Sequence, residues 1–243
     1  MRGAHRLARV RRFSWSAPSL RLLAALLPAL LALPACGGPS APPLPAAAEL
    51  LNKSADAMAA VRTVAVDVRV DPALTTLPVR AATGKLTAGG DAVGTATVNQ
   101  GTSTVEFNFV VTKGTVYLKG PTGTYQRLPL ALAASLYDPT ALLSPDRGIA
   151  ALLRTASNGV TQAREDVGGV PTYRVQANLD PHLVSSVLPG LAGANSGTLW
   201  IDQASSQLVK AQIQVPNAGG GPPAPVTVAL SDFNNPVTVA PPS

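Results

Sequence analysis

The sequence predicts an α+β domain, in which one long antiparallel β-sheet carries a few helices on one side. Three observations predict this fold. An amphipathic helical pattern comes first, a long series of short segments with a period of two follows, and apolar runs preceded by Asp-Pro or Ser-Pro pairs interrupt that series late in the chain. A strongly twisted sheet of about ten strands tends to curl, so we expect a concave face.

The first 35 residues have the pattern of a secretory signal peptide. Residues 1–21 carry six Arg and no acidic residue, and residues 22–33 are apolar throughout. A helix that spans a bilayer needs about 20 apolar residues, whereas this run is shorter and contains Pro28. We therefore expect residues 1–35 to be removed on export.

Cys36, the only cysteine in the chain, follows this leader directly. The tetrapeptide LPAC at 33–36 fits a bacterial lipobox, in which small residues admit the chain to a peptidase and the thiol accepts a diacylglycerol. The sequence thus predicts a lipid anchor at Cys36, on the extracytoplasmic face of the cell membrane. An ordinary signal peptide that ends near a cysteine is the alternative. Residues 36–45 are expected to form an extended tether and residues 46–243 a single domain.

The net charge changes once the leader is set aside. The whole chain has 19 Lys and Arg against 13 Asp and Glu, but six of the Arg lie in residues 1–35, which leaves 13 bases and 13 acids. A nucleic-acid-binding protein needs a basic patch, and the tether has no polybasic run that would bind a membrane. The composition therefore gives no support for a nucleic-acid partner.

The first half of the domain is expected to contain one helix and a meander of strands. The helix is predicted over 46–61, where apolar residues form one stripe. From residue 63 the period changes to two, and valines alternate with other residues up to residue 70. Short glycine-containing links separate the next strands, which are expected near 79–87, 92–99, 103–112, 115–120 and 124–128.

The second half mixes helices and strands. Asp138-Pro139 and Ser144-Pro145 each place an N-cap residue before a proline suited to the first helical position, and Asp180-Pro181 repeats this signal. Between and after these helices, strands are expected near 160–167, 170–179, 197–203, 207–216 and 225–233.

The sequence contains no recognisable constellation of catalytic residues or metal ligands. The G-x-S-x-G, P-loop, G-x-G-x-x-G and H-E-x-x-H motifs are absent, and His182 is the only histidine after Cys36. At the start of an expected helix, His182 and Asp180 are better explained by capping than by catalysis. Glu165-Asp166 is typical of a charged hairpin turn. We therefore expect no enzyme activity, no metal and no cofactor.

The segment TVEFNFVV at 104–111 is the most informative strand. Val105, Phe107 and Phe109 share one face of it, and Ala96 and Val98 of the preceding strand can line the same face. These side chains face either a packed core or an apolar cavity. On the residues alone the packed core is the commoner explanation, because any half-buried strand shows this alternation.

The order of these features resembles the LppX/LprA/LprF/LprG lipoproteins of mycobacteria, and among them most of all LprG. The likeness covers nearly the whole chain and is densest in FVVTKGTVYLKG (109–120) and YDPTALLSPDRGIAALL (137–153). The resemblance implies a half-barrel of antiparallel strands with helices on its concave side, similar in shape to the LolA/LolB carriers. It also implies an apolar cavity that takes the acyl chains of glycolipids or triacylglycerol.

The same resemblance implies site residues. Ala96, Val98, Val105, Phe107 and Phe109 are expected in the cavity wall, and Ala96 stands where LprG has a larger Val, which predicts a wider pocket here. Helical elements are expected to cap or gate the mouth of the cavity, and their candidate residues are Leu136, Leu142, Leu143, Ile149, Leu152 and Leu153. For any one of these residues, ordinary packing of a helix on a sheet is an equal alternative.

These expectations describe a membrane-anchored actinobacterial lipoprotein that binds acylated lipids and carries them across the cell envelope, with a lipid exporter as a candidate partner. Hiding an acyl chain requires an apolar cavity but no catalytic group, which agrees with the missing motifs. The alternative is an envelope lipoprotein with a solid core that serves as a scaffold or interaction module. A hydrolase built around His182 is a third hypothesis, which predicts activity that is lost in His182→Ala.

Overall fold

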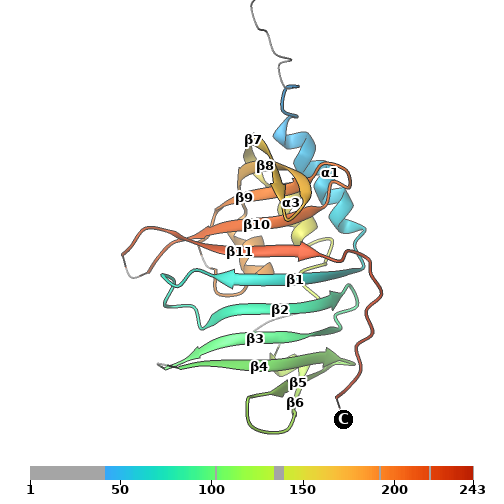
Figure 1. Cartoon of the computed structure of the whole chain (residues 1–243), viewed down its shortest axis with the longest axis vertical. Coiled ribbons are helices and arrows are strands. Elements are labelled where there is room, and N and C mark those ends of the chain that lie inside the picture. Colours follow the sequence, from blue (N-terminus) through green and yellow to red (C-terminus); the bar gives the residue numbers. More distant parts are fainter. Residues whose placement is uncertain (1–41, 102, 134–139, 192, 219, 243) are drawn as a thin grey trace, which may run out of the picture. The chain divides into compact units, whose positions relative to one another are not determined.

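In the described part of the chain, eleven β-strands form one antiparallel sheet (Figure 1). The structure is a computed structural model that describes residues 42–101, 103–133, 140–191, 193–218 and 220–242. The expected signal peptide, Cys36 and Leu136 lie outside these ranges. The strands are β1 (Thr63–Val70), β2 (Val79–Thr87), β3 (Ala92–Gln100), β4 (Ser103–Thr112), β5 (Thr115–Lys119), β6 (Gln126–Pro129), β7 (Ser157–Val167), β8 (Val170–Asn178), β9 (Ser196–Asp202), β10 (Leu208–Val215) and β11 (Ala224–Ser231).

The strand order joins two meanders at a central seam. The sheet runs β6-β5-β4-β3-β2-β1-β11-β10-β9-β8-β7, so the first and last strands of the domain are neighbours. At the seam β1 pairs with β11, from Ala65 opposite Ser231 to Val70 opposite Val226. Every other pair joins strands that are consecutive in the sequence. The predicted α+β fold with one long antiparallel sheet is confirmed.

The helices within the described residues are α1 (Ala47–Ala59), α2 (Leu130–Ala133), α3 (Ile149–Thr155) and α4 (Pro181–Val187). None of the helices in these ranges is long and apolar enough to cross a bilayer. The predicted cap of α4 is confirmed, because the Asp180 carboxylate accepts a hydrogen bond of 2.8 Å from the backbone N–H of His182.

The start of α3 differs from the prediction. Ser144 and Pro145 lie in a turn, and the helix begins only at Ile149, after Gly148. The backbone itself makes this turn: Gly148 N–H donates to Ser144 O, and Ile149 N–H donates to Leu142 O. A Cβ on Gly148 would collide with the carbonyl oxygens of Leu142, Ala141 and Ser144. Close approach of the backbone, and not a side-chain cap, therefore fixes where α3 starts.

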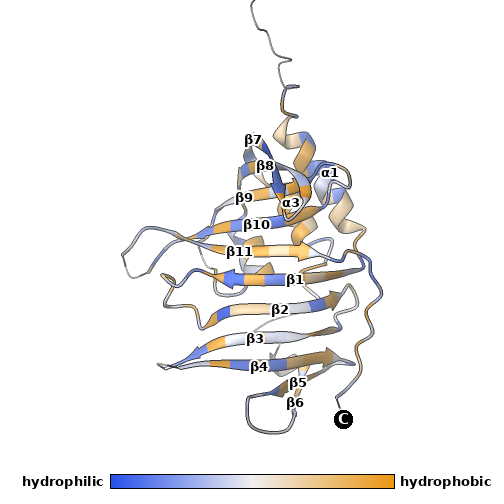
Figure 2. Cartoon of the chain, viewed as in Figure 1, coloured by the Kyte–Doolittle hydropathy of each residue, from blue (hydrophilic) through white to orange (hydrophobic). Residues whose placement is uncertain are grey.

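One face of the sheet, called here the inner face, carries the hydrophobic core. Figure 2 shows the alternation of hydrophobic and hydrophilic residues along β1. Helix α1 packs closely on this face, since a Cβ on Gly159 of β7 would lie 3.0 Å from side-chain atoms of both Ala47 and Leu51. Figure 1 shows α1 and α3 gathered toward the β7 end of the sheet. Helices α1, α3 and α4 thus cover the β7–β11 half, whereas inner-face residues of β3 and β4 are mostly only half-buried.

Candidate functional site

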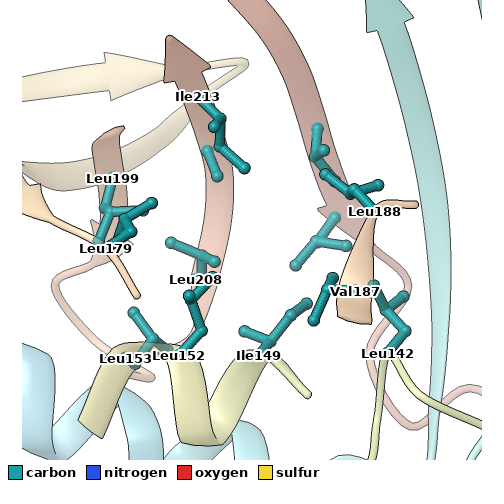
Figure 3. A pocket seen from close by; sticks show the side chains of 13 residues that line it. Leu142, Ile149, Leu152, Leu153, Leu179, Val187, Leu188, Leu199, Leu208 and Ile213 are labelled. Carbon is teal, nitrogen blue, oxygen red and sulfur yellow. The ribbon is translucent and has the colours of Figure 1, made fainter. Parts of the chain in front are cut away.

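An apolar pocket lies between the helices and the β7–β11 half of the sheet (Figure 3). Helices α3 and α4 contribute one wall and strands β9, β10 and β11 contribute the other, and all of its lining residues among those described are apolar. The lining residues are Leu142, Ile149, Leu152, Leu153, Leu179, Val187, Leu188, Leu199, Leu208, Ala211, Ile213, Val228 and Leu230.

This pocket is nearly filled by its own side chains. Its free space is about 20 Å³, close to what one water molecule needs. Sites for small molecules usually measure roughly 300–1,000 Å³. A ligand with an acyl chain could therefore enter only if α3 and α4 moved away from the sheet.

Helix α4 is held over the pocket largely by apolar packing. Its polar contacts include the Ser186 hydroxyl, which donates to Arg147 O at 2.7 Å and is 2.8 Å from Leu183 O, and the Asp180 cap of the first turn. Val184 and Val187 add buried apolar contacts with the core. Apolar contacts are not directional, so a cover of this kind can move without leaving many buried polar groups unpaired.

The predicted cap residues lie mostly in this pocket. Leu142, Ile149, Leu152 and Leu153 line it directly. Leu143 is buried in the same hydrophobic core but is not among the lining residues. Leu136 falls outside the described residues. The assignment of these residues to a cap or gate remains a prediction.

The predicted wall residues lie together elsewhere on the inner face. In the β3–β4 pair Ala96 is opposite Phe107, and Val98 is opposite Val105. All five predicted wall residues, including Phe109, are half-buried, and none lines the closed pocket. The wall and the pocket are therefore two parts of one face, and the role of the wall remains a prediction.

A continuous row of apolar residues connects these two parts. Each member is directly opposite the next on the neighbouring strand, and the row crosses eight strands from β4 to β8 by way of the β1–β11 seam. Its β1–β4 members are half-buried, and its β8–β11 members are buried. This apolar row consists of Phe107, Ala96, Ala82, Val68, Val228, Ala211, Leu199 and Val175.

The strand side of the pocket was not predicted from the sequence. Alternating apolar residues in β9, β10 and β11 gave the signal, for example Ala211 and Ile213 of β10. That signal identifies a buried face but not what covers it, because the covering helices come from distant segments. Only the register, which places Ala211 between Leu199 and Val228, brings the lining together.

The opposite face of the sheet has a different character. Trp200 of β9 is almost fully buried there, and the Lys210 ammonium lies 4.2 Å from the centre of its ring. Arg174, opposite Trp200 on β8, forms an ion pair of 3.1 Å with Glu165. Among the described residues, no group of three or more His, Cys, Asp or Glu side chains could hold a metal ion.

This architecture and its sequence match those of a known protein family. A sequence profile of the LppX_LprAFG lipoprotein family matches residues 46–239. The lipoarabinomannan carrier protein LprG of Mycolicibacterium hassiacum is 33% identical over 241 residues, with 91% of this chain and 97% of that protein covered. LprG of Mycolicibacterium smegmatis is 31% identical over 209 residues, with 83% and 85% covered.

Solved structures agree with the sequence relatives. The crystal structure of LprF from Mycobacterium bovis matches with a TM-score of 0.73 and 28% identity, over 83% of this chain and 99% of that one. The Mycobacterium tuberculosis lipoprotein LppX shares the fold, with a TM-score of 0.57 over 80% and 98% of the chains and 22% identity. These relatives form a family of non-enzymatic lipoproteins. The chain, with its eleven-stranded sheet and helix-covered apolar pocket, belongs to the LppX_LprAFG lipoprotein family.

Proposed function

We propose that this protein is a membrane-anchored lipoprotein that binds the acyl chains of a glycolipid or triacylglycerol on the inner face of its sheet and carries them across the cell envelope. Cys36 holds it in the membrane in this proposal, and a lipid exporter is the candidate partner that supplies or receives the cargo. The names of its LprG relatives, which are lipoarabinomannan carriers, support a glycolipid ligand.

The apolar row is the observation that carries this proposal. It offers an uninterrupted hydrocarbon surface, and the seven inter-strand steps along it amount to roughly 34 Å at about 4.8 Å each. A 16-carbon chain leaving a bilayer for water costs on the order of 12 kcal/mol, at about 0.8 kcal/mol per CH₂. A carrier must recover most of that free energy by contact along the whole chain, which a continuous row allows.

The closed pocket sets how loading begins. A chain first contacts the half-buried members of the row on β1–β4, including Ala82 and Ala96, whose small side chains leave room above the sheet. It then extends toward Val228 and Ala211 by displacing α3 and α4. Each methylene that enters packs against the apolar surface that the helices uncover, so loading needs no chemical energy source at the site.

Extractable lipid tests this proposal. The domain from Gly37 onward, made in an actinobacterial host, is compared by native mass spectrometry with Ala96→Trp. The matched control is Thr97→Trp, which puts the same indole on the opposite face of β3, since Thr97 pairs with Glu106 and not with Phe107. We expect acylated lipid on the wild type and on Thr97→Trp, and its loss from Ala96→Trp.

Two other outcomes have definite meanings. If all three proteins are lipid-free and equally stable, the carrier proposal is wrong and a scaffold role takes its place. If Ala96→Trp keeps its lipid, the acyl chain lies in the α3–α4 pocket alone and the predicted wall is wrong.

A further inference from the structure

The last residues of the tether are bound to the edge of the sheet. The Arg164 guanidinium donates to Pro42 O at 2.9 Å and to Pro43 O at 3.0 Å. The Thr161 hydroxyl donates to Pro45 O at 2.8 Å. Both side chains belong to β7, an edge strand of the sheet. The end of the tether, which its composition predicts to be an extended spacer, therefore makes specific hydrogen bonds with the domain.

The arrangement suits a segment that must hold one conformation. Proline fixes its own φ and has no N–H, so its carbonyl oxygen is the group left for recognition. A guanidinium presents several donors in a rigid fork, which matches two successive carbonyls. Arg164 also lies over the Tyr173 ring, 5.5 Å from its centre, and this restrains the fork.

We propose that Arg164 and Thr161, called here the tether clamp, determine which part of the domain faces the bilayer: the β7–β8 hairpin is held next to the membrane, and the β4–β6 end is turned away from it. This inference rests on the proposed anchor at Cys36. It concerns the orientation of the carrier, which lipid binding by itself does not specify.

Chain geometry supplies the constraint. Six residue steps separate Cys36 from Pro42, so that segment spans at most roughly 22 Å, and without the clamp the eleven steps to Ala47 would allow roughly 40 Å. The tether follows β7 in the opposite direction, because Pro45 is bound at Thr161 and Pro42 at Arg164. It therefore leaves the domain toward the hairpin turn at Gly168 and Gly169. Ten strand spacings of about 4.8 Å each separate β7 from β6, and together they exceed the roughly 22 Å that the clamped tether can span.

The hairpin itself does not oppose such contact. Its charged residues balance, because Arg164 and Arg174 are offset by Glu165 and Asp166. Glu165 is paired with Arg174, and the Asp166 carboxylate accepts from Gly169 N–H at 2.7 Å. No net negative charge remains there to repel an anionic lipid surface.

Site-specific fluorescence quenching on vesicles tests the inference with the full, acylated chain. Cys36 is the only cysteine and acylation consumes its thiol, so one introduced cysteine can be labelled alone. The reporter positions are Pro171→Cys on the hairpin and Thr122→Cys in the β5–β6 turn, both exposed. The vesicles are phosphatidylcholine with a small fraction of lipid that carries a nitroxide on its headgroup.

We expect the dye at position 171 to be quenched more strongly than the dye at 122, and this difference to be lost in the double variant Arg164→Ala/Thr161→Val. Arg154→Ala is the matched control, since it removes another exposed arginine, bonded to Asp56 on α1, and should keep the difference. Arg164→Lys cannot form the fork, so it should lose part of the quenching difference. It provides a milder variant if the double variant is unstable.

Equal quenching at both positions in the vesicle-bound wild type would overturn the inference and leave the carrier proposal intact, as would a difference that survives unchanged in the folded double variant. A chain that does not sediment with vesicles at all overturns the anchor and this inference together.

Discussion

Phe109 occupies the space that a side chain at Gly94 would need: a Cβ on Gly94 would lie 2.9 Å from Cζ of Phe109. The two residues are opposite each other in the β3–β4 pair, and Gly94 is in turn opposite Gly84 of β2. A Cβ on Gly84 would lie 3.3 Å from the same ring atom. One aromatic ring thus covers two glycines, a known way to stabilise glycine within a sheet.

Gly94→Ala should therefore destabilise the domain. The added methyl collides with Phe109 and with the carbonyl oxygen of Thr83, and the latter is backbone that cannot rotate away. Overpacking of this kind costs about 1–3 kcal/mol. Urea unfolding measures it, with Gly120→Ala as the control, because a Cβ there would be an ordinary 3.5 Å from Phe107. Equal stability of the two variants would contradict the tight packing of this ring.

Asp180→Ala should loosen the cover of the pocket. Loss of the N-cap of α4 costs about 0.5–2 kcal/mol of helix stability, and α4 supplies Val187 to the pocket wall. We expect faster hydrogen exchange at the α4 amides and faster uptake of a fluorescent fatty-acyl lipid. Asp180→Ser retains a capping oxygen and should behave like wild type. Unchanged exchange in the alanine variant would show that packing alone holds the helix.

Lys210→Met should lower stability by removing the ammonium over the Trp200 ring. Cation–π pairs contribute about 0.5–1 kcal/mol at exposed sites and about 2 kcal/mol when desolvated, and methionine keeps the apolar stem. Trp200 is the only tryptophan after Cys36, so its fluorescence directly reports the urea unfolding of a chain that begins at Gly37. Lys85→Met, which removes only an exposed lysine 3.7 Å from Asp232, is the control and should have little effect.

Arg80→Met should release the loop between β1 and β2. The Arg80 guanidinium donates to Leu74 O at 2.6 Å and Leu77 O at 2.5 Å, and Leu74 is buried in the core. Hydrogen bonds from a charged donor contribute about 1.5–3 kcal/mol each. We expect a lower unfolding midpoint and earlier proteolysis within residues 71–78. Arg69→Met, at an exposed arginine of β1, should leave both unchanged.

The strands were the part of the fold that the sequence predicted best, and local pattern is the reason. Strand β2 (Val79–Thr87) and strand β4 (Ser103–Thr112) match the expected 79–87 and 103–112, because alternation and the flanking turns are encoded within each segment. Strand β7 begins at Ser157 and not near 160, since α3 ends at Thr155 and the chain turns at once into the sheet. The residue pattern of a strand does not by itself specify where the preceding helix ends.

The candidate site could be predicted only in part. The register of Ala96 with Phe107 follows from the short β3–β4 hairpin, so local sequence was enough to place these two together. The pairing of Val68 with Val228 is different, because it depends on two strands from opposite ends of the domain meeting at the seam. No local signal in either strand specifies that partner. The sequence pattern therefore could not predict the pocket, which lies on the β11 side of the seam.

The same seam has a consequence for how the protein is made. Strand β1 is synthesised near the start of the domain, but one of its edges stays unpaired until β11 has also been synthesised. During that interval a strand with valines at every second position presents free backbone groups, which is the situation that favours aggregation. Each meander can form from neighbours in the chain, whereas the pairing of Val70 with Val226 must wait for nearly the last residues. The final strand therefore completes the sheet, and a chain that stops before Ala224 would leave one edge of β1, the middle strand, without its partner.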